Sequence, residues 1–242
     1  MKVLITDKIN EKAANIVRAA AEPVILPTMS EDELCDVIGE YDALLVRSQT
    51  KVTDKVIKAG KNLKIIGRAG VGVDNIDLNS ATEHGIIVVN SPDGNTHAAA
   101  EHTVALMLSM ARNIPDAVAS TKAGNWERSK FTGVEVFGKT LGVIGFGKIG
   151  QHVARTALAL GMNLVVNDPY TTKEFVEKFG GKYIENLDDF WALPDFITLH
   201  TPKTPETTHL INEKTIAKMK DGVRIITVQG EESLMKKHLR QP

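Results

Sequence analysis

The feature that most constrains the fold is a glycine pattern in the second half of the chain, which follows a short apolar run at residues 141–144. Its three glycines, spaced as G-x-G-x-x-G, are Gly145, Gly147 and Gly150. A helix-competent segment, residues 151–160, comes next, and a second apolar run at 163–166 leads to Asp168. Strand, glycine turn, helix, strand and acid in this order are typical of a βαβ unit that binds a dinucleotide. The alternative is a glycine-rich strand-to-helix turn that binds no ligand.

Each part of this pattern has a physical reason in dinucleotide binding. Gly145 permits a tight turn, Gly147 lets the backbone approach a pyrophosphate, and Gly150 allows the helix to pack closely on the strand. The start of the helix offers oriented N–H groups and a partial positive charge to the phosphates. Asp168 can accept hydrogen bonds from the adenosine ribose, and its charge repels a 2′-phosphate. Since residues 169–172 contain no arginine, we expect NAD rather than NADP.

Length and composition exclude several other classes of protein. The chain has 242 residues, of which 43% are hydrophobic and 24% charged, as in a globular protein with one large or two modest domains. A formal net charge of -1 gives no electrostatic reason to expect a nucleic-acid or membrane partner. The single cysteine, Cys35, rules out an internal disulfide, and no apolar run is long enough to span a bilayer. Without a signal-peptide pattern at the N-terminus, these features predict a cytoplasmic protein.

Short apolar segments alternate with amphipathic segments along the first ninety residues. The expected strands are residues 2–6, 23–26, 43–46, 63–67 and 86–90. The expected helices are residues 11–20, 30–38, 53–58 and 78–83. Because the strands are continuously apolar rather than alternating, we expect a parallel sheet that is covered on both faces.

A turn-rich segment at residues 91–95 separates this series from a second one. A helix expected at 97–112 is apolar around most of its circumference, so we expect it to be buried, and a second subunit in a homodimer is one candidate cover. The strands expected in the second series are residues 140–144, 163–166, 182–184, 196–200 and 224–228. The predicted fold is therefore α/β, with two doubly wound parallel sheets, the second of them Rossmann-like.

Several motifs spread over the chain carry a resemblance to one known family. They are VRSQT at 46–50, GRAGVGVDN at 67–75, NSPDGN at 90–95, WER at 126–128, the glycine pattern, and HTP at 200–202. In this order, over residues 1 to about 228, they resemble the D-isomer-specific 2-hydroxyacid dehydrogenase family. The resemblance implies NAD as cofactor and the oxidation of a D-2-hydroxy acid, here a phosphorylated one, to the 2-keto acid.

The resemblance also implies a division into domains. Residues 1–94 would form a flavodoxin-like substrate-binding domain, and residues 95–242 a Rossmann domain that binds NAD. In the family, the chain returns to the first domain after the second is complete. We expect that return to be missing here and the NAD-binding domain to be truncated after about Val228.

By resemblance, the residues that hold the substrate are Arg47, Ala69, Gly70, Val71, Gly72, Asn95 and Arg128. The backbone amides of 69–72 would receive its carboxylate, and Arg128, which a neighbouring subunit could supply, would receive its phosphate. The residues implied for the cofactor are Val71, Gly145, Gly147, Lys148, Ile149, Gly150, Asp168, Thr201 and Pro202. Structural alternatives stay open: Arg47 as a helix cap or ion-pair partner, Arg128 as a solvated charge, Asn95 as a helix cap, and Gly70, Gly72 and Thr201 as parts of turns.

The match to the family ends near residue 228. The family pattern continues with an arginine that binds the substrate, and Gly230 occupies that position here. The family's later glutamate and catalytic histidine fall in segments that we do not find in these 242 residues, and no histidine present, His238 included, matches a catalytic motif. We therefore assign no catalytic and no metal-binding residue. The chain is expected to be a dehydrogenase, an inactive NAD-binding or subunit-interaction module, or the product of a truncated, spliced or frameshifted reading frame, with 224–228 as an apolar edge strand.

Overall fold

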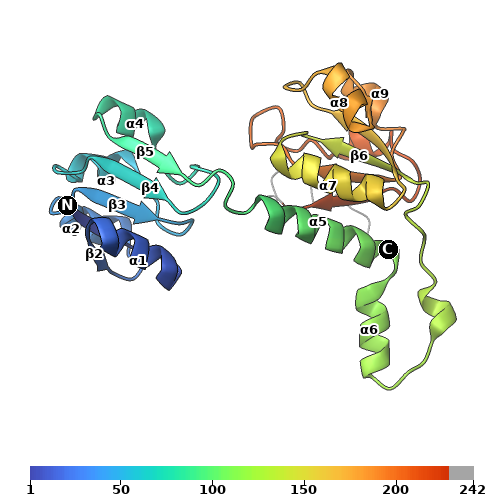
Figure 1. The fold of residues 1–242 in the computed structure, drawn as a ribbon, viewed down its shortest axis with the longest axis horizontal. Helices are drawn as coiled ribbons and strands as arrows, with labels where there is room; N and C mark the ends of the chain where they lie inside the picture. Colours follow the sequence, from blue (N-terminus) through green and yellow to red (C-terminus); the bar gives the residue numbers. More distant parts are fainter. Residues whose placement is uncertain (229–242) are drawn as a thin grey trace. The chain divides into compact units, whose positions relative to one another are not determined.

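Figure 1 shows the computed structural model, which describes residues 1–228. The chain divides into two compact units, Met1–Asn95 and Thr96–Pro242, each with its own sheet and its own core. In the described residues, no helix combines the length and apolarity needed to cross a membrane. Two sequence assignments, Gly230 and His238, lie outside the described residues.

The first unit contains a parallel five-stranded sheet with the strand order β2-β1-β3-β4-β5. Its strands are β1 (Lys2–Ile5), β2 (Glu22–Ile25), β3 (Ala43–Val46), β4 (Ile65–Arg68) and β5 (Ile87–Asn90). Its helices are α1 (Glu11–Ala20), α2 (Glu31–Ile38), α3 (Asp54–Ala59) and α4 (Leu78–Glu83). This is the flavodoxin-like order, in which the direction of winding reverses between β1 and β3. The prediction of a doubly wound sheet is confirmed.

Unbroken apolar runs explain where these strands lie. Leu4, Leu44 and Ile66, on three neighbouring strands, are at most 1% exposed and belong to one core cluster. Burial of each such side chain contributes roughly 1.5–3 kcal/mol. Polar side chains set the helix starts: Asn10 caps α1, and Ser30 forms a capping box at the start of α2.

The second unit contains another parallel five-stranded sheet, with the order β10-β9-β6-β7-β8. Its strands are β6 (Thr140–Ile144), β7 (Asn163–Asn167), β8 (Lys182–Tyr183), β9 (Phe196–Leu199) and β10 (Arg224–Thr227). Its helices are α5 (Thr96–Ala111), α6 (Ile114–Lys122), α7 (Lys148–Ala159), α8 (Lys173–Phe179), α9 (Leu187–Phe190), α10 (Glu213–Ile216) and the 3-10 helix η1 (Arg128–Phe131). Numbered within the unit, the order is 3-2-1-4-5, which is the Rossmann order, with its reversal between β6 and β9.

Both faces of this second sheet are covered, as its continuously apolar strands predict. Leu141 and Val143 of β6 belong to the core cluster on one face, and Ile144 belongs to the cluster on the other. Strand β10 is an edge strand among the described residues, in agreement with the sequence analysis.

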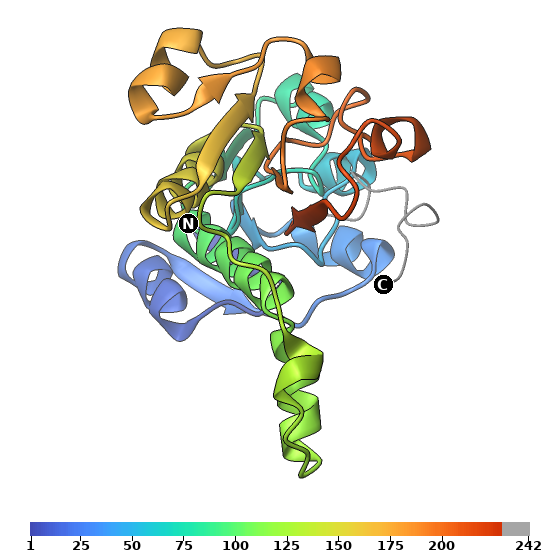
Figure 2. The same cartoon turned by 90° about the vertical axis from the view of Figure 1, so that its right-hand side faces the viewer.

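Helix α5 has one buried and one exposed face within this chain. Ala100 and Met107 are buried in the core beside α7 and β10, but Leu106 is 38% and Met110 37% exposed within this chain. Within this chain the neighbouring elements cover one face of α5 and leave the other exposed, so the expected burial of that second face, which a second subunit could provide, stays a prediction. The helix α6 and η1 were not predicted; they extend away from the sheet of their own unit (Figure 2), and α6 contains no buried residue.

Candidate cofactor and substrate sites

The glycine pattern lies where the carboxyl ends of β6 and β9 meet, at the reversal point of the second sheet. Gly145 follows β6 and has a φ of +88°, a conformation that L side chains rarely adopt. A Cβ atom at this position would lie 2.5 Å from the carbonyl oxygen of His200, which follows β9. The two loops therefore touch, and only glycine fits between them. Ligands of open α/β sheets bind at this kind of crevice.

The other two glycines serve two different purposes. A Cβ at Gly150, in the first turn of α7, would lie 2.3 Å from the carbonyl oxygen of Gly145, so this glycine allows the helix to approach the turn. A Cβ at Gly147 would meet no atom within 4 Å. Packing therefore does not require glycine at 147, and the space in front of its backbone, at the start of α7, is open to a ligand's phosphates.

The residue between the first two glycines fixes the turn. Phe146 is 2% exposed, and its ring centroid lies 5.1 Å from that of Phe179 and 6.1 Å from that of Phe175, both on α8. Its backbone N–H donates to the carboxylate of Asp168. Aromatic packing on one side and a charge-assisted hydrogen bond on the other hold the turn in place before any ligand arrives.

Asp168 follows β7 and is 8% exposed. One of its oxygens accepts from the N–H of Phe146, and the other accepts from the N–H of Tyr170 at 2.7 Å. A carboxylate offers about four lone-pair sites, so each oxygen keeps one for a further donor such as a ribose hydroxyl. The acid is therefore oriented by the turn and can still bind a sugar.

The loop after β9 presents two unsatisfied polar atoms at the same crevice. Nε2 of His200 lies 2.9 Å from Oγ1 of Thr198, but its Nδ1 and Oγ1 of Thr201 are buried and have no partner among residues 1–228. Burial lowers the pKa of His200 to about 4, so its ring is neutral near pH 7. Buried polar atoms without partners are uncommon and indicate a missing ligand or water. Together with the open backbone at Gly147, they fit a bound dinucleotide.

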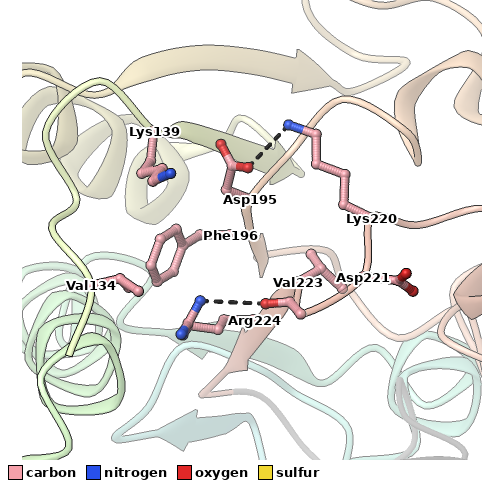
Figure 3. A pocket seen from close by; sticks show the side chains of 9 residues that line it. Val134, Lys139, Asp195, Phe196, Lys220, Asp221, Val223 and Arg224 are labelled. Carbon is pink, nitrogen blue, oxygen red and sulfur yellow. Dashed lines mark hydrogen bonds and ion pairs between the residues drawn. The ribbon is translucent and has the colours of Figure 1, made fainter. Parts of the chain in front are cut away.

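A second hollow of about 150 Å³ lies at the opposite end of the second sheet (Figure 3). Its lining residues are Val134, Lys139, Asp195, Phe196, Lys220, Asp221, Gly222, Val223 and Arg224. Asp195 there accepts from the N–H of Thr140 at 2.8 Å and from Nζ of Lys220 at 3.1 Å, which joins the amino ends of neighbouring strands. No residue predicted for the cofactor or the substrate lines this hollow, and its contacts have a structural role.

In the first unit, Arg47 follows β3 at the reversal point of the sheet and is exposed. Its Nη1 donates to the carbonyl oxygen of Lys8 at 3.1 Å, and its own N–H donates to Asp7 at 2.6 Å. The side chain therefore contacts a neighbouring loop through a carbonyl group rather than capping a helix. Four of the five guanidinium N–H donors are left for an anion.

The loop at residues 69–72 offers fewer free amides than its sequence predicts. The N–H of Ala69 donates to Val46 and that of Gly70 to Arg68, each at 2.8 Å. The amides of Val71 and Gly72 donate to no acceptor within residues 1–228. The expectation that all four amides receive a carboxylate is therefore narrowed to these two, because the chain already uses the others.

The glycine at position 72 also has a packing reason. The guanidinium of Arg68 donates from Nη1 to Asp74 at 2.7 Å, and a Cβ at Gly72 would lie 2.8 Å from that Nη1 and 2.7 Å from the carboxylate oxygen. The glycine therefore lets the loop close over the Arg68–Asp74 ion pair. Because Asp74 already pairs with this guanidinium, the free amides of Val71 and Gly72 are the groups of this loop that could receive an anion.

The remaining predicted residues lie in different places. Asn95 ends the first unit directly before α5, and Arg128 lies in η1 of the second; both are exposed. Lys148 and Ile149 are in the first turn of α7, and Pro202 follows Thr201 at the crevice. Within the second unit, the structure thus brings the predicted cofactor residues to one crevice, whereas Val71 belongs to the first unit.

Sequence reasoning missed three polar residues that organise the first unit. Asp7, Thr50 and Asn75 form a hydrogen-bond network around the loop that carries Arg47. A signal for Asp7 was present, since it is an acid directly after a buried strand, as Asp168 is.

Comparison with known proteins agrees with this geometry. The profile of the family described as "D-isomer specific 2-hydroxyacid dehydrogenase, NAD binding domain" matches residues 104–235. The chain belongs to this family. The cofactor of the matched domain is NAD, in agreement with the prediction from Asp168.

The family's relatives include curated enzymes and solved structures. The chain is 54% identical over 225 residues to the D-3-phosphoglycerate dehydrogenase of Synechocystis sp., covering 93% of this chain and 40% of that protein. It is 49% identical over 226 residues to the D-3-phosphoglycerate dehydrogenase of Methanocaldococcus jannaschii, covering 93% of this chain and 43% of that protein. The chain therefore spans less than half the length of these two relatives.

The structural comparison supports the fold of both units. The D-lactate dehydrogenase of Aquifex aeolicus, solved with NAD and lactic acid, matches with a TM-score of 0.86 and 30% identity, over 97% of this chain and 71% of that one. The TT0316 protein of Thermus thermophilus matches with a TM-score of 0.89 and 30% identity, over 98% of this chain and 76% of that one.

Proposed function

We propose that this chain binds NAD and 3-phosphoglycerate and serves the NAD-dependent oxidation of that D-2-hydroxy acid to 3-phosphohydroxypyruvate, the step that opens serine synthesis. The observation that carries the proposal is the pair of relatives named D-3-phosphoglycerate dehydrogenase, at 54% and 49% identity over 93% of this chain. The residue-level support is the crevice of the second unit, where a fixed glycine turn, Asp168 and two unpartnered polar atoms converge.

Each ligand would be held by groups of suitable charge. The amides at the start of α7 and the open backbone of Gly147 would receive the pyrophosphate, and Asp168 the adenosine ribose. Bound NAD supplies a hydride acceptor at its nicotinamide ring. Arg47 and the amides of Val71 and Gly72 would hold the carboxylate of the substrate, and Arg128 its phosphate.

The domain assignment and the oligomeric state are parts of the same proposal. Residues 1–94 would bind the substrate, and residues 95–242 the cofactor. Leu106 and Met110 are spaced i, i+4 and form an exposed apolar strip on α5, which supports a homodimer. Sedimentation equilibrium tests this: the wild type is expected to be a dimer and Leu106→Glu a monomer.

A second candidate function is NAD binding without turnover. Gly230 stands in the sequence where the family pattern has an arginine that binds the substrate, and this observation favours the second candidate. Titration calorimetry with NAD and a steady-state assay with 3-phosphoglycerate distinguish the two. Binding with turnover supports the dehydrogenase, binding without turnover supports the second candidate, and the absence of NAD binding contradicts both.

A further inference from the structure

A buried carboxylate in the first unit accepts four hydrogen bonds. Asp7 is 2% exposed. Its Oδ2 accepts from the N–H of Arg47 at 2.6 Å and from the N–H of Thr50 at 3.2 Å. Its Oδ1 accepts from Oγ1 of Thr50 at 2.7 Å and from Oγ1 of Thr28 at 3.0 Å. All four lone-pair sites of the carboxylate are therefore used within the protein.

The donors to Asp7 come from different loops at one end of the sheet. Asp7 follows β1, Thr28 follows β2, and Arg47 and Thr50 follow β3. One carboxylate thus joins the carboxyl ends of three neighbouring strands, on both sides of the point where the winding reverses. Burial raises the pKa of Asp7, but the hydrogen bonds lower it more, so the pKa lies below its usual value and the group is charged near pH 7.

Asn75 holds the same loop by donating hydrogen bonds to two of the loop's carbonyl groups. Nδ2 of Asn75 donates to the carbonyl oxygens of Arg47 at 2.7 Å and of Thr50 at 2.6 Å. The backbone of Arg47 is therefore held at its N–H by Asp7 and at its C=O by Asn75. Only its side chain can still change conformation, and the direction in which that side chain leaves the sheet is set.

We propose that Asp7 is a positioning residue for the binding of an anionic substrate, and that it acts by fixing the backbone from which Arg47 reaches that substrate. This inference rests on the proposed function. Asp7 itself cannot receive the substrate, because it is buried, negative and fully hydrogen-bonded. A carboxylate is suited to this task because two backbone N–H groups and two hydroxyl groups converge on it, and charge-assisted bonds to them are strong.

The same sheet offers a matched control at its other end. Asp42, just before β3, accepts from the N–H of Lys2 at 2.9 Å and from Nζ of Lys64 at 2.7 Å. It also joins neighbouring strands, but at the amino ends, away from Arg47. If Asp7 only stabilised the sheet, its loss and the loss of Asp42 would affect ligand binding alike.

The experiment compares Asp7→Ala, Asp7→Asn, Thr50→Val and Asp42→Ala in the full chain by calorimetric titration with 3-phosphoglycerate and, separately, with NAD. We expect Asp7→Ala to weaken 3-phosphoglycerate binding at least about tenfold. Asp7→Asn should stay within about threefold of the wild type, since its oxygen still accepts from both amides and its NH2 can donate to hydroxyl oxygens. Asp42→Ala should match the wild type, and all variants should bind NAD equally well.

A ligand-independent readout accompanies the titrations. Hydrogen exchange of the Arg47 and Thr50 amides should accelerate in Asp7→Ala and not in Asp42→Ala. Thr50→Val, which keeps its N–H but loses its hydroxyl, should weaken 3-phosphoglycerate binding about threefold and provides the test if Asp7→Ala does not fold. Unchanged 3-phosphoglycerate affinity in Asp7→Ala, or in Thr50→Val where that variant is used, overturns the role of Asp7 and leaves the proposed function intact. A wild-type chain that binds NAD but no 3-phosphoglycerate overturns the proposed substrate, and with it the role of Asp7.

Discussion

The two units share one architecture and use the same end of their sheets differently. In the first, Asp7, the acid at the reversal point, accepts four hydrogen bonds from the protein's own loops and has no lone pair left for a ligand. In the second, Asp168 accepts two internal hydrogen bonds, and the buried Nδ1 of His200 and Oγ1 of Thr201 have no partner in the described chain. The acid of the first unit is therefore fully used by the protein's own loops, whereas the acid of the second keeps capacity for a ligand.

At the amino ends the two units resemble each other. Asp42 in the first unit and Asp195 in the second each accept from one backbone N–H and one lysine Nζ. These carboxylates join strands and face no predicted ligand. The contacts of these acids thus differ between the units at the carboxyl ends, where doubly wound folds bind their ligands, and are alike at the amino ends. Four experiments test this difference between the two units.

The largest effect is expected at the glycine turn. Gly147→Ala places a methyl group in open space that we assign to the pyrophosphate, so NAD affinity should fall at least about 1000-fold, or about 4 kcal/mol, while stability stays unchanged. Its matched partner, Gly150→Ala, puts a Cβ against the Gly145 carbonyl and should also lower the free energy of unfolding by about 1–3 kcal/mol. Titration calorimetry and urea unfolding measure both. Undiminished NAD binding in Gly147→Ala would mean that the crevice is not the cofactor site.

Acid should destabilise the second unit before the first. The pKa of His200 is about 4 in the folded chain and near 6.5 when unfolded, so the unfolded state binds more protons between these values. Stability of the second unit should therefore fall by about 3 kcal/mol as the pH drops from 6.5 to 4. Asp7 has a lowered pKa, so its contribution to the first unit is complete above pH 3.8 and is lost only as the pH falls further.

Fluorescence can follow this difference, because both tryptophans, Trp126 and Trp191, belong to the second unit. Urea unfolding at several pH values, monitored by tryptophan emission, gives the slope of the free energy of unfolding against pH. His200→Asn should flatten it, and the exposed-site control His102→Gln should not. A slope that survives in His200→Asn would assign the acid sensitivity to other groups.

The cofactor acid should show a smaller effect. Asp168→Ala removes the ribose acceptor and the charge that repels a 2′-phosphate, so NAD affinity should fall about 30-fold, or about 2 kcal/mol, and the preference over NADP should narrow. Asp168→Asn retains one acceptor oxygen and serves as the conservative control. Parallel titrations with both coenzymes measure the ratio; a preserved preference in Asp168→Ala would contradict the role assigned to this acid.

The smallest effect is expected at the amino ends. Lys220→Ala and Lys64→Ala each remove one partly exposed ion pair, with Asp195 and Asp42 respectively, and each should lower the free energy of unfolding by less than about 1 kcal/mol. Neither should change the affinity for NAD or 3-phosphoglycerate. A ligand effect of either variant would show that the amino ends are not purely structural.

The strands could be predicted almost residue by residue, and the reason is physical. Runs such as 43–46 and 141–144 contain no polar side chain and are bounded by polar or glycine residues, which is what burial on both faces requires. Helices α6 and α8 were not predicted because they bury little: α6 contains no buried residue, and Val176 is the one buried residue of α8. For such segments local sequence decides little.

The cofactor site could be predicted from the sequence because its residues are close in sequence and form a known pattern. The network around Asp7 could not be predicted, since Asp7 and Asn75 contact Thr50, in the loop that carries Arg47, across sequence separations of 43 and 25 residues. Those contacts depend on the order of the strands, which alternation of strands and helices does not determine. The same holds for the amides of Ala69 and Gly70, whose internal acceptors are set by the fold of the loop.

The packing of the Phe146 ring against Phe175 and Phe179 has a kinetic consequence. Because the turn has its binding conformation before the coenzyme arrives, binding does not incur the entropic cost of ordering a flexible loop. Encounter with the coenzyme can then proceed at a rate governed by diffusion and orientation. Discrimination between NAD and NADP would then appear in their dissociation rates rather than in their association rates.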